Sequence, residues 1–281
     1  MLLGLSTPVV VQVPGAAAPW EADAGIDELT QIAVTADELG FDYLTCSEHV
    51  AVPSADAAIR GAVYWDPLAT LGFLAAHTRR IRLATSVLVL GYHHPLAIAK
   101  RYGTLDTVSG GRLVLGVGIG SLTEEFALLG APWERRAARA DDAIRALRAS
   151  LSTATPRYHG QFYDYDGMTV LPHAQQTRVP IWVGGRTAAS LRRAVDLADG
   201  WMPFGLAPNE VRAMLADVDP PTHFEVLLSA VLDPEADPDG TRARLAMLRD
   251  SGATAVTCAV RADSPRHYCD QLVRLRDMEQ Q

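Results

Sequence analysis

Cysteine is scarce in this chain of 281 residues, which contains only Cys46, Cys258 and Cys269. An odd number of cysteines at wide spacings argues against a disulfide framework and against a zinc site. Buried thiols in a reducing, cytoplasmic setting are the better expectation. Long apolar runs are absent as well. Because no stretch of about 18 uninterrupted apolar residues occurs, we expect no membrane span.

Positive charge is in deficit, with 25 Lys and Arg against 33 Asp and Glu, for a net charge of −8. Basic residues cluster only on arginine-rich helix faces, which argues against nucleic acid and favours a small-molecule substrate. The first residues, MLLGLSTPVVVQVPG, lack the basic segment of a secretion signal and predict a strand. His93 and His94 fit neither the HxH nor the HExxH spacing of a metal site, so no metal is expected. We expect His94 to shape a loop and His93 to face the binding site.

Short β-branched runs alternate with amphipathic helical patterns along the whole chain, which predicts an α/β fold. Residues 26–39 and the stretch opening at Pro95 show clear helical spacing, and Gly40 and Gly110 follow them as helix-ending residues. Further apolar stripes run through residues 140–151 and 191–198. The predicted strands are residues 2–11, 41–45, 81–90, 113–117, 181–183, 201–203, 224–232 and 255–260. Eight βα units in a single domain, residues 1–281, predict a TIM (β/α)8 barrel with its chemistry at the carboxyl ends of the strands.

Residues 157–171, RYHGQFYDYDGMTVL, interrupt this alternation between the fourth helix and the fifth strand. The segment is rich in Tyr, Phe and Gly and has no helical period, so we expect a short hairpin-like insertion. Its aromatic residues Tyr158, Phe162 and Tyr163 predict an apolar wall for the substrate site.

Residues 113–121, LVLGVGIGS, run from an apolar strand into a series of glycines. Their GxGxG spacing departs from the GxGxxG of a dinucleotide-binding fold, and they follow the fourth strand instead of the first. At the end of a barrel strand, glycines can remove side chains so that a flat ring lies against the backbone. A turn that needs positive φ is the alternative. The pattern favours a flat cofactor.

Two further stretches carry candidate chemistry. In VPIWVGGRTAAS, residues 179–190, a strand leads through Gly184, Gly185, Arg186 and Thr187 into a helix, and exposed N–H groups at a helix start favour a phosphate. In CSEHV, residues 46–50, Glu48 and His49 follow the second strand, where histidine can shuttle protons near neutral pH. Adjacent strand residues point to opposite sides, so Glu48 need not touch His49.

These motifs together resemble the luciferase-like monooxygenase superfamily, and most closely its oxidoreductases that use the deazaflavin coenzyme F420. The resemblance rests on GFDYLTCSEHV, on RIRLATSVLVLGYHHPLAIAKRYGTLDTVSGGRLVLGVGIGS and on VPIWVGGRTAASLRRAVDLADGW. It implies a barrel, a homodimer and catalytic roles for His49 and Glu48. It also implies a strand-three bulge at Ser86-Val87 with a non-proline cis peptide behind the ring. The implied cofactor-binding residues are Glu48, Thr85, Ser86, Val87, Gly118, Gly120, Ser121, Gly184, Gly185, Arg186 and Thr187.

The chain departs from the sugar-phosphate dehydrogenases of this superfamily at one position. A glutamate that acts as an acid follows the strand-four glycines there, whereas this chain has Ser121, with Glu124 and Glu125 as the nearest carboxylates. The phosphosugar reaction is therefore not expected. The resemblance implies F420-dependent hydride transfer to an unidentified small organic substrate. The alternatives are an FMN-dependent monooxygenase and a flavin- or deazaflavin-binding protein without turnover.

Overall fold

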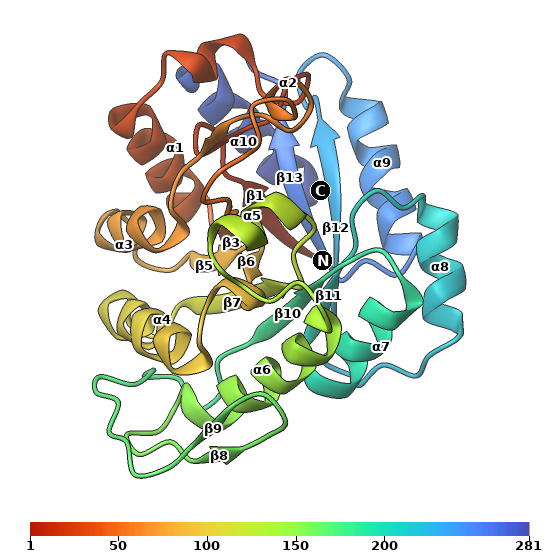
Figure 1. Ribbon diagram of the computed structural model, residues 1–281. Coiled ribbons are helices and arrows are strands. Elements are labelled where there is room, and N and C mark those ends of the chain that lie inside the picture. The colour runs from red at the N-terminus through yellow and green to blue at the C-terminus, as the bar shows by residue number, and fades with distance from the viewer. Residues whose placement is uncertain (281) are drawn as a thin grey trace.

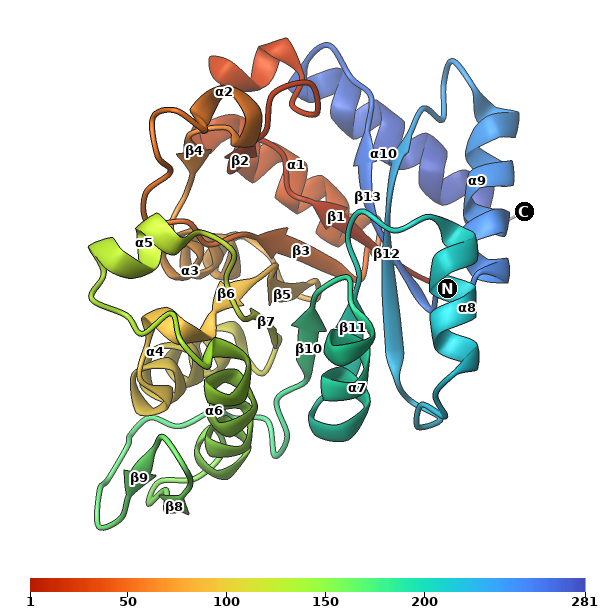
Figure 2. The ribbon, with the colours of Figure 1, turned by 45° about the vertical axis from the view of Figure 1, so that its right-hand side comes forward.

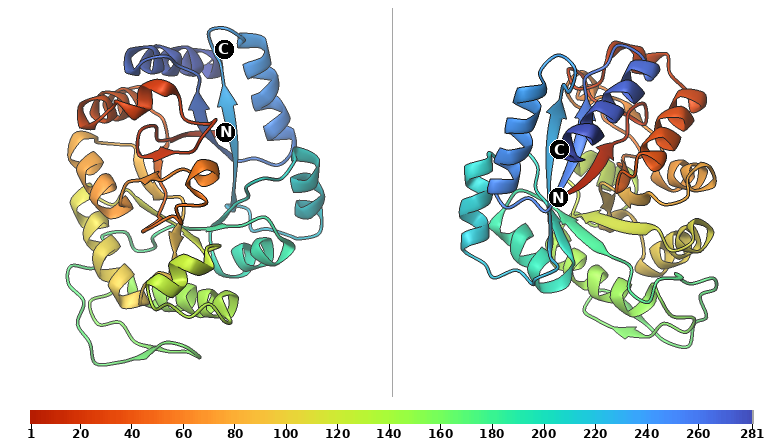
Figure 3. Two further views of the ribbon diagram at one scale, coloured as in Figure 1. Left: turned by 45° about the horizontal axis from the view of Figure 1, so that its top comes forward. Right: turned by 180° about the vertical axis from the view of Figure 1, so that it is seen from behind.

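A computed structural model describes residues 1–280 and contains a closed barrel of eight parallel strands inside a ring of helices (Figures 1 and 3). The strands pair in chain order, and β10 closes the circle by pairing with β7. The predicted TIM barrel is confirmed. The barrel strands are β1 (Leu2–Ser6), β3 (Tyr43–Cys46), β5 (Arg82–Thr85), β7 (Leu113–Gly118), β10 (Ile181–Gly184), β11 (Gly200–Met202), β12 (Glu225–Leu232) and β13 (Ala255–Val260).

The helices begin and end largely where local signals predict. In α4, Pro95 occupies the first turn and the side chain of His94 caps it by accepting from the Leu96 N–H, while Gly110 ends it at φ 73°. Gly40, at φ 77°, follows α1. The helices are α1 (Ile26–Glu38), α2 (Ala57–Arg60), α3 (Pro67–His77), α4 (Pro95–Ser109), α5 (Thr123–Leu128), α6 (Arg136–Ser150), α7 (Ala188–Leu197), α8 (Pro208–Ala216), α9 (Pro238–Asp250) and α10 (Pro265–Gln280), with 3-10 turns η1 (Pro19–Ala22) and η2 (Leu90–Tyr92). None of these helices within residues 1–280 is long and apolar enough to cross a membrane.

Two predicted strands are each divided in two. Residues 2–11 form β1 and then, after Val9 at φ 73°, the short β2 (Val11–Gln12), which pairs with β4 (Val63–Tyr64) outside the barrel. Residues 81–90 form β5 and β6 (Leu88–Val89), separated by the cis peptide bond between Ser86 and Val87. The predicted cis bond is therefore present at the predicted place. Apolar runs showed where the extended backbone lies, but they did not show these interruptions.

The amino-terminal half of the barrel interior is filled by side chains. Tyr43 and Trp182 meet edge to face with ring centroids 5.2 Å apart, and the Tyr43 hydroxyl lies 2.9 Å from the Thr257 hydroxyl. A Cβ on Gly4 would come within 2.2 Å of the Tyr43 ring, so glycine is required at that position for the ring to fit. The strand residues of opposite orientation, such as Leu3 and Leu44, pack with the helices. A hollow can therefore form only toward the carboxyl ends of the strands.

The insertion between α6 and β10 is a hairpin, as predicted. Strands β8 (Tyr158–His159) and β9 (Asp164–Tyr165) pair antiparallel, and Figure 2 shows them outside the helix ring beside α6. Buried Asp142 of α6 holds the hairpin, because its carboxylate accepts from the Tyr158 hydroxyl at 2.5 Å and from the Phe162 N–H at 2.7 Å.

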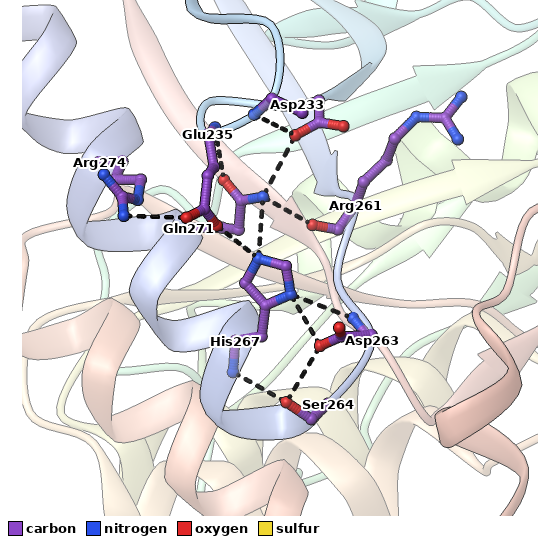
Figure 4. A network of polar contacts seen from close by, with 9 residues as sticks. Asp233, Glu235, Arg261, Asp263, Ser264, His267, Gln271 and Arg274 are labelled. Carbon is purple, nitrogen blue, oxygen red and sulfur yellow. Dashed lines mark hydrogen bonds and ion pairs between the residues drawn. The ribbon is translucent and has the colours of Figure 1, made fainter.

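A polar network ties together the loops that follow β12 and β13 (Figure 4). His267 of α10 lies between two carboxylates, with Nδ1 2.8 Å from Asp263 and Nε2 2.8 Å from Glu235. The neighbouring Gln271 donates to the Arg261 carbonyl at 3.0 Å. The hydrogen bond to Asp263, with that to Glu235, outweighs desolvation and raises the pKa of His267 above its ordinary value.

Candidate active site

A cavity of 1120 Å³ opens at the carboxyl ends of the strands. Every barrel strand, or the loop directly after it, contributes to the lining. This volume exceeds the roughly 300–1,000 Å³ of a typical small-molecule site, so there is room for a large cofactor with a second molecule beside it. The lining includes Ser6, Thr7, Thr45, His49, Val87, Gly118, Ser121, Gly184, Thr187, Met202, Phe204, Leu227, Val231, Thr257 and Ala259.

The cavity brings together all but one of the residues predicted for the site. The exception is Thr85, which is fully buried and whose hydroxyl donates to the Gly116 carbonyl at 2.6 Å. Thr85 therefore supports the contact between β5 and β7 and does not reach the cavity. The predicted residues on the lining are Glu48, His49, Ser86, Val87, Gly118, Gly120, Ser121, Gly184, Gly185, Arg186 and Thr187.

Glu48 is buried and both of its carboxylate oxygens are engaged. One accepts from the Val89 N–H at 2.7 Å, and the other lies 2.6 Å from His93 Nε2. The carboxylate thus fixes β6 directly after the cis bond. His93 serves Glu48 and is not part of the cavity lining, so the expectation that it faces the site is wrong.

His49 takes its carboxylate partner from another part of the chain. Its Nδ1 lies 2.8 Å from Glu125 Oε2, and its ring packs edge to face on Tyr64 with centroids 4.6 Å apart. The Glu125 side chain is fully buried, whereas 21% of the His49 side chain remains exposed. The imidazole therefore lies between a buried acid and the open cavity, which suits a group that exchanges protons with a bound molecule.

The sequence did not identify Glu125 as part of the site. Glu124 and Glu125 both begin a short helix, and only the three-dimensional arrangement separates exposed Glu124 from buried Glu125. Their place just after the strand-four glycines, at the carboxyl end of a barrel strand, was the available signal.

The glycines of the predicted ring site make room for protein side chains. A Cβ on Gly118 would lie 2.6 Å from Val87 Cγ2, and a Cβ on Gly184 would lie 2.8 Å from Val87 Cγ1. Gly120 has φ 78°, and a Cβ there would lie 2.5 Å from the Phe126 ring. The absence of side chains at Gly118 and Gly184 therefore lets Val87 reach the cavity wall, and a ring lying against these glycines stays a prediction. For Gly120, the alternative of a positive-φ turn is also confirmed.

The predicted phosphate loop, residues 184–187, leads into α7, whose first turn is capped. Thr187 is the N-cap of α7, and it exchanges hydrogen bonds with Ser190, whose N–H donates to the Thr187 hydroxyl at 3.2 Å. Gly185 adopts φ 148°, and its N–H donates to the Met202 carbonyl at 3.2 Å. The Gly185 N–H is therefore already bonded, so an anion would bind at the N–H groups at the start of α7.

Charge in the cavity is opposite to the charge of the whole chain. Among the described lining residues, Glu48 is the one carboxylate, and it is already satisfied by Val89 and His93. The basic lining residues are Arg136, Arg186, Arg193 and Arg244; Arg193 is paired with Asp141, which leaves three arginines to set the charge. A chain with net charge −8 thus presents a positive cavity, which favours an anionic ligand.

The hairpin does not form the substrate wall. Its residues Tyr158, Phe162 and Tyr163 are missing from the cavity lining. Tyr158 and Phe162 contact α6 instead, through Asp142 and through Arg139, which lies 4.5 Å from the centre of the Phe162 ring, whereas the Tyr163 ring packs edge to face on His94. The apolar wall comes from elsewhere, from Val11, Val13, Tyr64, Phe204 and Val231.

Comparison with known proteins identifies relatives. A family model described as luciferase-like monooxygenase matches residues 1–272. An F420-dependent glucose-6-phosphate dehydrogenase of Microbacterium testaceum is 31% identical over 214 residues, which cover 74% of this chain but only 58% of the relative. Two solved structures cover 99% of this chain with a TM-score of 0.74. They are monooxygenase RslO1 from Streptomyces bottropensis, at 20% identity, and an F420-dependent secondary alcohol dehydrogenase in complex with an F420-acetone adduct, at 15% identity.

Proposed function

Because this chain belongs to the luciferase-like monooxygenase family, we propose that it is an oxidoreductase that transfers a hydride between coenzyme F420 and a small organic substrate. The observation that carries the proposal is the meeting of His49, Val87 and Gly185 on one cavity. A proton-exchanging group, an apolar wall and an anion-binding loop are what a flat, phosphorylated redox cofactor requires. The F420-dependent relative at 31% identity favours the deazaflavin over other flat cofactors.

The residues present fit such a cofactor. Val87 packs over Gly118 and Gly184, which have no side chains, and so presents an apolar surface to the cavity. The start of α7 with Arg186 and Thr187 supplies the donors for a phosphate. When bound, the deazaflavin supplies the carbon that gives or receives the hydride.

His49 handles the proton that accompanies hydride transfer. Its Nδ1 bond to Glu125 leaves Nε2 as the ring nitrogen that can take or give a proton. Glu48 orders the segment after the cis bond through the Val89 N–H, so its part in the reaction is to hold the wall in place. Ser121 lines the cavity and brings no acid, in keeping with a substrate other than a phosphosugar.

An FMN-dependent monooxygenase is the second candidate, since the family is described as luciferase-like monooxygenase. Parallel equilibrium titrations with F420 and FMN distinguish the two. Tighter binding of F420, with anaerobic oxidation of reduced F420 by an acceptor from a panel of carbonyl and unsaturated compounds, supports the proposal. Oxygen consumption with reduced FMN supports the monooxygenase. Binding without turnover under either condition supports a binding protein.

The role of His49 is tested by His49→Ala. We expect turnover to fall by about 10²–10⁴-fold while the affinity for F420 changes little, because general acid–base catalysis contributes on that order. His159→Ala on the exposed hairpin is the matched control and should leave turnover unchanged. Equal turnover of the two variants across the acceptor panel would remove His49 from the mechanism.

A further inference from the structure

Glu125 is a buried carboxylate that does not line the cavity. It accepts three hydrogen bonds, from the Tyr92 hydroxyl at 2.6 Å, from the Val50 N–H at 2.5 Å and from the Ala51 N–H at 3.2 Å, and its Oε2 lies 2.8 Å from His49 Nδ1. No arginine or lysine pairs with it in the described chain. A buried acid that no arginine or lysine neutralises is costly to keep unless its acceptor role is used.

The two oxygens of Glu125 have separate tasks. Oε1 accepts from the backbone N–H groups of Val50 and Ala51 and so fixes the loop that follows His49. Oε2 lies within reach of the Tyr92 hydroxyl and of His49 Nδ1. One carboxylate therefore holds both the backbone beside His49 and the ring itself.

Ionisation of Glu125 decides which ring nitrogen of His49 carries hydrogen. Burial opposes ionisation, but the hydrogen bonds from Tyr92, His49, Val50 and Ala51 outweigh it and lower the pKa of Glu125 below its ordinary value. An ionised carboxylate only accepts, so the neutral imidazole must donate from Nδ1. Its lone pair is then on Nε2. The edge-to-face contact with Tyr64 restricts rotation of the ring.

We propose that Glu125 is a positioning residue that fixes the tautomer and orientation of His49, with Tyr92 keeping Oε2 in place. The inference rests on the proposed function for its catalytic consequence, since His49 is the group that exchanges the proton there. The tautomer itself does not depend on F420. Glu125 acts through His49 and does not touch the reacting molecules.

Glu125→Gln is the decisive substitution because it keeps the shape of the side chain. The amide oxygen can still accept from the Val50 and Ala51 N–H groups, whereas the amide nitrogen cannot accept a hydrogen bond from Nδ1. The amide instead donates to Nδ1, and hydrogen moves to Nε2. We expect turnover to fall by at least about 100-fold, as for other carboxylate–histidine pairs with a reversed tautomer, and the affinity for F420 to stay within about threefold.

The tautomer is read from long-range ¹H–¹⁵N correlation spectra of protein labelled with [¹⁵N]histidine. The His49 signal is assigned by its loss in His49→Ala, at about pH 8.5, about two units above the ordinary pKa of histidine. We expect Nδ1–H in the wild-type protein and Nε2–H in Glu125→Gln. A change that only loosened the fold would not reverse the tautomer.

Two matched variants complete the test. Glu124→Gln makes the same charge change on the exposed neighbour in α5 and should alter neither tautomer nor turnover. Tyr92→Phe removes one donor to Glu125 while leaving the Nδ1 bond, so the tautomer should remain and turnover should stay within about tenfold. Wild-type His49 with hydrogen on Nε2 would overturn the proposal even if Glu125→Gln failed to fold. Full activity of folded Glu125→Gln in a functioning enzyme would overturn it too. An inactive wild-type protein with the expected tautomers would count against the proposed function alone.

Discussion

Gly185→Ala tests whether the loop before α7 is built as tightly as the structure indicates. Gly185 has φ 148°, a region that side-chain-bearing residues rarely adopt, and its added Cβ would lie 2.6 Å from Ser190 Cβ and 2.8 Å from Ser190 Oγ. Ser190 cannot move aside easily. It is buried, and its hydroxyl donates to the Thr187 carbonyl at 2.7 Å and accepts from Trp201 Nε1 at 3.3 Å.

The size of the effect follows from these distances. Ordinary contact begins at 3.4 Å, so the loop or α7 must shift by 3.4 − 2.6 = 0.8 Å. Backbone strain of this kind costs about 1–3 kcal/mol, and overpacking costs about 1–3 kcal/mol more. The free energy of unfolding should therefore fall by about 2–6 kcal/mol. At roughly 2 °C for each kcal/mol in a chain of this length, Tm should fall by about 4–12 °C.

Thermal unfolding followed by circular dichroism measures this loss, and Gly72→Ala is the matched control. Gly72 lies inside α3 with no atom within 4 Å of an added Cβ, so alanine should raise stability by about 0.5–1 kcal/mol. In the titrations with F420 and FMN, Gly185→Ala should weaken binding of the preferred cofactor at least tenfold. A shift of 0.8 Å in this loop would lengthen a hydrogen bond from the loop to the cofactor beyond the usual range of about 2.7–3.2 Å. Unchanged Tm and unchanged affinity in Gly185→Ala would refute this reasoning.

Two further predictions concern parts of the chain away from the cavity. Asp142→Asn should make the hairpin, residues 157–171, more susceptible to proteolysis, because Asp142 holds it through Tyr158 and Phe162. The affinity for F420 should not change, because that segment does not line the cavity. Limited digestion measures the first effect and a parallel titration the second, and a loss of affinity would contradict the prediction. The hydrogen bond to Asp263, followed by that to Glu235, raises the pKa of His267. Protonated His267 therefore stabilises the fold, and this contribution is complete below the ordinary histidine pKa of about 6.5 and is lost as pH rises through the raised pKa. The Tm difference between wild type and His267→Gln should therefore be larger at about pH 6 than at about pH 9, and a difference that grows with pH would be the opposite of this expectation.

The barrel was predictable because its signals are local and repeated. Buried parallel strands are short apolar runs, and helix ends such as Pro95 and Gly110 are marked by residues with few alternatives. The division of residues 81–90 has a different origin. Its cis bond lies where the Ser86 N–H donates to the Cys46 carbonyl, a contact between strands far apart in sequence. The resemblance to a known family located that bond, whereas the apolar pattern alone predicted a continuous strand.

The site was predictable at its rim and much less so in its supporting contacts. Glu48, His49 and Gly185 follow strand ends, and the fold alone places strand ends around one hollow. The substrate wall was misplaced because aromatic composition does not tell which side of α6 a hairpin covers. Phe162 packs against α6, and the wall is formed instead by β2, β4, β12 and the loops after β2 and β11.

The dipeptide Glu48-His49 shows why adjacent residues in a motif need not share a task. Their side chains contact different parts of the chain. Glu48 binds His93 beside η2, and His49 binds Glu125 of α5. The dipeptide thus contributes one residue to each of two carboxylate–histidine pairs, Glu48 with His93 and His49 with Glu125. One orders the wall beside the cis bond and the other orders the ring that faces the cavity. A change at Glu48 should therefore disturb the wall and cofactor affinity first, whereas a change at Glu125 should disturb proton transfer first. The motif alone would assign both effects to the same pair of neighbours.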